Sequence, residues 1–168
     1  MTLSMYQTSA PRFVAMLNNL SAILDKGKAY AESKKIEATV LTSDRLFPDM
    51  FTLARQVQIA CDSAKGAMAR LAGVEIPKHE DTEQTFDELK ARIARTIAFV
   101  ETLKPAHIDG SEDREIVLKA GGTEVKFKGA NYLLDYALPN LYFHVTTAYN
   151  ILRHNGVDVG KWDYLGRL

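Results

Sequence analysis

The 168-residue sequence contains a single cysteine, Cys61, and this scarcity excludes two kinds of structure. One cysteine cannot form a disulfide within the chain, and it has no second cysteine with which to hold zinc. The absence of disulfides is typical of a reducing compartment. The N-terminal segment also lacks a basic stretch before a continuous apolar run, because Asn18 and Asn19 interrupt its apolar residues. We therefore expect a cytoplasmic protein that does not insert into a membrane.

An excess of charge of one sign is also missing. The sequence has 21 Lys and Arg residues and 21 Asp and Glu residues, so the formal net charge is zero. No run of five like charges occurs, although nucleic acids and anionic membranes attract concentrated basic surfaces. We therefore expect neither nucleic acid nor a membrane as a partner.

Apolar residues, in contrast, are plentiful and make up 46% of the chain. A chain of this length can bury one hydrophobic core and is too short to need two, which predicts a single domain over residues 1–168. Apolar residues recur at spacings of three and four in four segments, which predicts amphipathic helices. These segments are 4–30, 48–72, about 82 to just before Pro105, and 130–155.

Proline, glycine and polar residues suggest where these helices begin and end. Pro11 either opens the first helix after a Ser9 cap or kinks a longer helix. Pro48 suits the start of the second helix, and Gly73 suits its end. The third helix is expected to take Asp81 or Thr82 as its N-cap. The segment before Pro48 is interpreted as a long connection that packs over the helices, and connections of this length are often functional.

Two further segments depart from the helical pattern. Alternating apolar residues in 116–118 and 125–127 flank Gly121-Gly122, which predicts a two-stranded hairpin. The C-terminal segment contains Trp162 and Tyr164, and exposure of these rings would leave an apolar patch. We expect the tail to pack back on the helices or on a second subunit.

The last predicted helix carries the most informative polar residue. Leucines, alanines and an isoleucine share one helical face with His144, which should therefore point inward. Pro139, just over one turn earlier, should kink or divide this helix and could open space beside the imidazole. The alternative is a core histidine that bonds a carbonyl or a tyrosine, such as Tyr149.

Gln56 and Cys61, both in the second predicted helix, have two interpretations each. Gln56 flanks the apolar stripe and is either a ligand contact or a residue bonded to solvent or backbone. Cys61 is either an inert small apolar residue or a nucleophile that uses His144 as its base.

The segments PDMFTLARQVQIACDSAKGAMARLAG and YLLDYALPNLYFHVTTAYNILRHNGVDVGKWDYLG carry a family resemblance. The chain resembles the DinB/YfiT-like superfamily and, within it, the domain-of-unknown-function family with the serial number nineteen ninety-three. This resemblance covers essentially the whole chain. It implies an all-α fold, an up-down four-helix bundle with a small β-hairpin inserted before the last helix, and commonly a homodimer.

Many proteins of this superfamily bind a divalent metal through one histidine of the second helix and two histidines, four residues apart, on the last helix. His144 matches the first of that pair, but Ala148 stands four residues later and Thr147 three residues later. No histidine occurs between Pro48 and Gly73. His154 would lie about 15 Å farther along the helix and roughly 80° around it, too far to share an ion. The metal triad is therefore not carried over, and no cofactor is expected.

We therefore predict a protein that binds a small ligand in a pocket lined by His144, Gln56, Thr147 and Tyr149, with a degenerate or absent metal site. One alternative is a metal-dependent enzyme that transfers a thiol or hydrolyses a small substrate. Its zinc or nickel would be held by His144, with waters or Gln56 completing the coordination. A second alternative is a structural dimer without a site. The sequence leaves open whether the protein is an enzyme.

Overall fold

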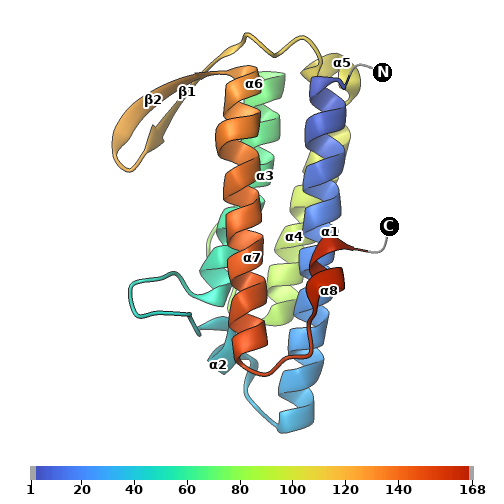
Figure 1. Ribbon diagram of the computed structural model, residues 1–168, viewed down its shortest axis with the longest axis vertical. Coiled ribbons are helices and arrows are strands. Elements are labelled where there is room, and N and C mark those ends of the chain that lie inside the picture. Colours follow the sequence, from blue (N-terminus) through green and yellow to red (C-terminus); the bar gives the residue numbers. More distant parts are fainter. Residues whose placement is uncertain (1–2, 167–168) are drawn as a thin grey trace.

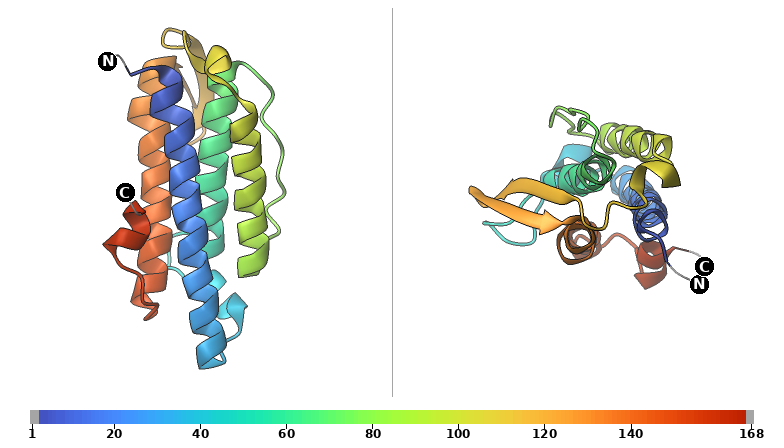
Figure 2. Two further views of the ribbon diagram at one scale, coloured as in Figure 1. Left: turned by 90° about the vertical axis from the view of Figure 1, so that its right-hand side faces the viewer. Right: turned by 90° about the horizontal axis from the view of Figure 1, so that it is seen from above.

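The computed structural model describes residues 3–166, which fold mainly into helices with one antiparallel two-stranded sheet (Figure 1). The long helices α1 (Met5–Lys34), α3 (Leu53–Ala72), α4 (Phe86–Thr102) and α7 (Leu138–His154) lie side by side (Figure 2). The shorter elements are α2 (Ala38–Thr42), α5 (Pro105–Ile108), β1 (Glu115–Ala120), β2 (Thr123–Lys128), α6 (Gly129–Asn131), the π-helix η1 (Tyr132–Ala137) and α8 (Lys161–Leu165). Within the described range, no helix is both long and apolar enough to cross a membrane.

The first helix begins earlier than a Ser9 cap would allow. Ser4 is its N-cap, and its hydroxyl accepts a hydrogen bond from the Gln7 amide while the Gln7 side chain accepts one from the Ser4 amide. This reciprocal pair satisfies two backbone donors that a helix start leaves open. Ser9 is buried inside the helix and donates its hydroxyl to the Met5 carbonyl. Of the two alternatives for Pro11, the Ser9 cap is therefore wrong, and the longer helix is present, because α1 runs through Pro11.

The other predicted helix starts also need correction. Helix α3 begins after Thr52, whose hydroxyl accepts a hydrogen bond from the Arg55 amide, and not at Pro48. Helix α4 begins after Thr85, which forms a capping box with Glu88, and not after Asp81 or Thr82. In both helices the hydroxyl of a threonine satisfies the amide three residues later. Part of the expected connection before Pro48 is helical, because α1 continues to Lys34 and α2 follows.

The apolar stripes of the long helices meet in one core. Small residues on α3 let its neighbours approach closely, and α3 makes its most extensive contacts with α7 and α4. Gly27 of α1 has the same role, because an added Cβ would lie 2.9 Å from the Phe86 ring of α4. The fully buried stripe of α3 consists of Leu53, Val57, Ala60, Ala64, Ala67 and Leu71, as its spacing predicts.

Pro139 does not divide the last helix. The amide of Leu138 donates to the Leu133 carbonyl five residues earlier, so the turn directly before the proline is wider than an α-helical turn. A π-turn at this point accommodates a residue that cannot donate to the helix and whose ring needs space near the preceding turn. The helix continues through Pro139 to His154.

The predicted hairpin is formed by β1 and β2. Strands β1 and β2 pair in register from Glu115 opposite Lys128 to Ala120 opposite Thr123, and Gly121 and Gly122 take positive φ angles at the turn. This hairpin projects from one end of the helices (Figure 1).

Helix α8 packs on α1, where Asn19 donates a hydrogen bond to the Tyr164 carbonyl and Lys26 pairs with Asp163. The tail therefore folds back on the helices, as expected, while Trp162 remains 66% exposed.

A buried ion cluster joins α3, α4 and the segment between them. Arg92 of α4 has no exposed surface, and its guanidinium lies 2.9 Å from Asp62 and Asp81 and 3.2 Å from Glu83. Glu83 also accepts a hydrogen bond from the side-chain amide of Gln58, which belongs to α3. Three carboxylates from two segments therefore surround one buried cation.

We expect Arg92→Leu to lower the free energy of unfolding by about 3–5 kcal/mol, because it leaves the buried Glu83 carboxylate without its main partner. Arg95→Leu is the matched control, since Arg95 is 58% exposed and reaches only Glu83. Its cost should stay below about 1 kcal/mol. Urea denaturation of both variants tests this, and equal losses would contradict a central role for Arg92.

A second substitution tests the junction between the hairpin and the last helix. A Cβ on Gly129 would lie 2.0 Å from the Ser111 carbonyl oxygen, so Gly129→Ala should force the backbone apart. We expect a loss of about 1–3 kcal/mol in thermal or urea unfolding. Gly160→Ala serves as the control, because a Cβ there meets no atom within 4 Å.

Candidate functional site

Helices α3 and α7 bring Gln56 and His144 into direct contact. The Nδ1 atom of His144 lies 2.7 Å from the Oε1 atom of Gln56, although 88 positions separate them in the chain. Gln56 is 1% exposed and His144 is 8% exposed. The two polar side chains therefore satisfy each other at the edge of the core.

A third group sets the direction of this hydrogen bond. Gln56 donates its Nε2 amide to the Phe51 carbonyl at 3.2 Å, which leaves its oxygen facing the imidazole. Because an amide oxygen only accepts hydrogen bonds, Nδ1 of His144 must carry the proton. The Nε2 atom of His144 is then the acceptor of the neutral ring, and no residue within 3–166 forms a hydrogen bond with it.

Electrostatics favour the same neutral form. Burial lowers the pKa of His144 below its ordinary value, and the positive charge of Arg55 lowers this pKa further. Both effects disfavour the imidazolium ion. His144 is therefore a neutral hydrogen-bond acceptor near pH 7.

Exposed phenylalanines accompany this pair. The Phe143 ring is perpendicular to the His144 ring, with centroids 5.3 Å apart, and is 58% exposed. Phe51, whose carbonyl holds Gln56, is 55% exposed. An exposed aromatic ring therefore adjoins the one acceptor atom of the imidazole.

The structure gives the other two predicted site residues different partners. Thr147 is 4% exposed and donates its hydroxyl to the Phe143 carbonyl of the same helix. Tyr149 directs its hydroxyl to the Val159 carbonyl at 3.4 Å, and its ring lies against Tyr164. In the alternative of a core histidine, the expected partner was a tyrosine or a carbonyl, whereas the structure gives His144 the side-chain oxygen of Gln56.

The environment of Cys61 disfavours the thiolate that a nucleophilic cysteine needs. Its side chain is fully buried, and burial raises the pKa of the thiol to about 12, so that it stays protonated near neutral pH. Among residues 3–166, no group of three or more histidine, cysteine, aspartate or glutamate side chains is placed to hold a metal ion.

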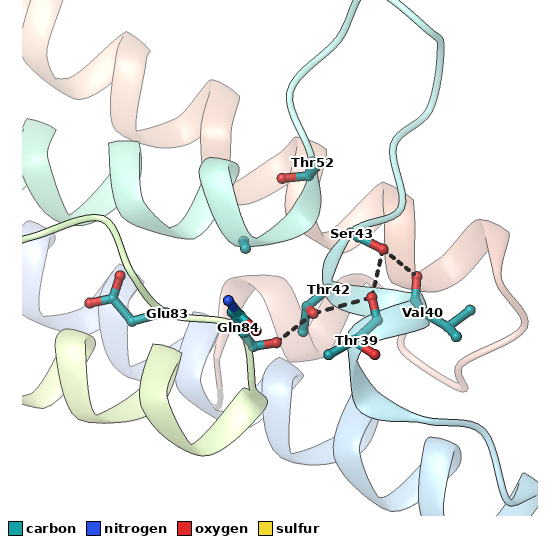
Figure 3. Close-up of a pocket in the computed structure, with 8 residues that line it drawn as sticks. Thr39, Val40, Thr42, Ser43, Thr52, Glu83 and Gln84 are labelled. Atoms are coloured by element: carbon teal, nitrogen blue, oxygen red, sulfur yellow. Dashed lines mark hydrogen bonds between the residues drawn. The ribbon is translucent and has the colours of Figure 1, made fainter.

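Five cavities among the described residues are lined by residues other than His144. One cavity of about 340 Å³ is bordered by α2, the start of α3 and the segment before α4 (Figure 3). Several of its hydroxyl groups are already bonded, because Thr42 donates to the Gln84 carbonyl and Ser43 donates to the Thr39 carbonyl. Neither His144 nor Gln56 lines this cavity.

Two arginines form contacts that were not expected from the sequence. Arg92 interrupts the buried stripe of α4 between Leu89 and Ile93, and a charged residue at an inward position was a detectable signal of the ion cluster. Arg70 of α3 contacts Tyr132 across the seam with η1, and no local pattern indicates that pairing.

Comparisons with known proteins identify relatives of the chain. The sequence model of the domain of unknown function DUF1993 matches residues 5–165. The fold is similar to the crystal structure of a DinB family member protein from Shewanella denitrificans, with 46% sequence identity and a TM-score of 0.87. That similarity covers 97% of this chain and 92% of the other chain. No curated protein matches the chain.

The depressed pKa of His144 predicts a pH dependence of stability. Between the folded pKa and the unfolded value of about 6.5, the unfolded chain binds more protons, so protonation favours unfolding. The contribution of His144 should be complete above about pH 6.5 and should be lost as the pH falls toward the folded pKa. Urea denaturation between about pH 7 and 5 should show a weaker pH dependence in His144→Phe than in the wild type.

The position of the proton on the His144 ring can be checked directly by NMR spectroscopy. Long-range proton–nitrogen NMR correlations should show His144 protonated on Nδ1 at neutral pH. A ring protonated on Nε2 would contradict the hydrogen-bond assignment.

Proposed function

The chain belongs to the DUF1993 family of DinB-like proteins, and from this premise we propose that it binds a small ligand at His144 without using a metal ion. The ligand would donate one hydrogen bond to Nε2 of His144 and place an apolar part against Phe143. The observation that carries this proposal is the bond between Gln56 and His144, which fixes the imidazole as a neutral acceptor.

The surroundings of the pair support a small amphipathic ligand. A donor that meets Nε2 would satisfy the one ring atom without a partner among the described side chains. The exposed Phe143 ring would lose contact with water when an apolar group covers it. A phenolic or similar hydroxyl compound combines these two features.

The arrangement is less suited to the metal-dependent alternative. A metal site needs several donor atoms directed at one point, whereas the Gln56 oxygen and Nδ1 of His144 are directed at each other. Ala148, one turn after His144 on the same face, has no donor atom in its side chain and is fully buried. These features support a ligand site in which the metal centre of related proteins has been lost.

The proposal includes the architecture and the assembly expected from the sequence. The four long helices would form an up-down bundle in a single domain, and two copies would associate as a homodimer. An exposed apolar residue such as Trp162 supports association, because burial of such surface stabilises contacts between subunits.

The test uses protein purified without a histidine tag, with phenol as the probe. The side-chain amide signals of Gln56 should shift saturably in the wild type and should not shift in His144→Phe. The matched control is His154→Phe on the same helix, where the histidine is exposed, and this variant should bind phenol as the wild type does.

Metal analysis of the same preparations tests the metal-dependent alternative. Stoichiometric zinc or nickel in the wild type that is lost in His144→Ala would overturn the proposal in favour of the metal-dependent enzyme. Absence of any saturable shift with phenol would overturn the ligand chemistry inferred here.

A further inference from the structure

A second cavity lies between α3, η1 and the start of α7, and β1 of the hairpin borders it. This cavity has a volume of about 180 Å³ and is bordered by Arg70, Ser63, Lys119, Tyr136 and Asn140, among others. Its lining includes neither His144 nor Gln56. The cavity is therefore separate from the proposed ligand site.

Tyr132 holds the Arg70 side chain in place through two contacts. The Nη1 atom of Arg70 donates to the Tyr132 hydroxyl at 3.1 Å, and its guanidinium carbon lies 5.9 Å from the centre of the same ring. An added Cβ on Gly66 would lie 2.6 Å from Nη1, so the absent side chain of Gly66 makes room for the guanidinium. Glycine inside a helix is less favourable than alanine, and here it allows Arg70 to lie along α3.

Arg70 has no carboxylate partner within the described part of the chain. None of the ion pairs formed by residues 3–166 includes it, although it is only partly exposed. Its hydrogen-bond partner, Tyr132, is neutral, because burial raises the pKa of that hydroxyl. A guanidinium has five N–H donors, of which only one is bonded to this tyrosine.

The neighbouring acid does not cancel this positive charge. Asp62 borders the same cavity, but its carboxylate lies 2.9 Å from Arg92 and 2.9 Å from Lys65. Two cations therefore already neutralise Asp62. Lys119 of β1 adds a second positive charge to the cavity wall, opposite α3.

We propose that this cavity binds a small oxyanion, the phosphate or carboxylate group of a small molecule. Arg70 is its principal contact, because a guanidinium presents parallel donors that match two oxygens of such a group. Lys119 contributes charge, and the hydroxyls of Ser63 and Tyr136 complete the donor set from α3 and η1. The volume suits an anionic group of a few heavy atoms.

The test titrates the full chain with inorganic phosphate and, in a separate arm, with acetate, at low ionic strength. Proton–nitrogen NMR signals of Ser63, Arg70 and Lys119 should shift saturably in at least one arm. Binding of phosphate alone identifies a phosphate group, whereas binding in both arms identifies a general oxyanion site. Absence of saturable shifts in both arms overturns the proposal.

Substitutions locate the binding. Arg70→Gln should weaken binding by about tenfold or more, because charged hydrogen bonds are lost. Arg12→Gln is the matched control on the exposed face of α1 and should leave the affinity within about twofold. Equal affinity in Arg70→Gln and the wild type would overturn the assignment.

Lys119→Gln keeps the test valid if Arg70→Gln fails to fold. Lys119 is exposed on the hairpin, so its loss should weaken anion binding about threefold without unfolding the protein. Lys126→Gln on the adjacent strand is its control. His144→Phe should retain the anion site, which separates failure of this inference from failure of the proposed function.

Discussion

The buried guanidinium of Arg92 is the constraint on which the arrangement of the helices depends. A cation without exposed surface is costly unless carboxylates surround it, and Asp62, Asp81 and Glu83 do so. These acids belong to α3 and to the segment between α3 and α4, which contains no helix or strand between residues 73 and 85. Charge pairing therefore fixes that segment and sets how α3 and α4 lie against each other.

Helix α3 contributes polar residues to both sites, Gln56 to the candidate ligand site and Arg70 to the proposed anion site. Its inner face is built from small apolar residues, so the functional groups lie on its flanks. Gln56 reaches His144 of α7 near one end of the helix, Asp62 reaches Arg92 of α4 in the middle, and Arg70 reaches Tyr132 of η1 near the other end. One helix thus aligns the candidate ligand site and the proposed anion site along a single seam.

The two sites differ in their electrostatics. At His144, burial and the charge of Arg55 keep the ring neutral, which favours a ligand that donates a hydrogen bond. Arg70 donates a hydrogen bond to a neutral tyrosine, which does not cancel its positive charge. The guanidinium therefore favours a ligand that carries negative charge. Ligands of the two kinds would therefore not compete for one position.

Local sequence patterns were sufficient to predict the long helices, the hairpin and the direction of many side chains. Apolar spacing identified the long helices and the inward position of His144, and Gly121-Gly122 identified the hairpin, because these features follow from local backbone geometry. The helix starts were harder, since several residues before α3 and α4 can cap a helix. Only Thr52 and Thr85 meet the amides that need them. The partners of His144, Arg92 and Arg70 were decided by the tertiary structure alone, because each contact joins segments that meet only when the helices dock.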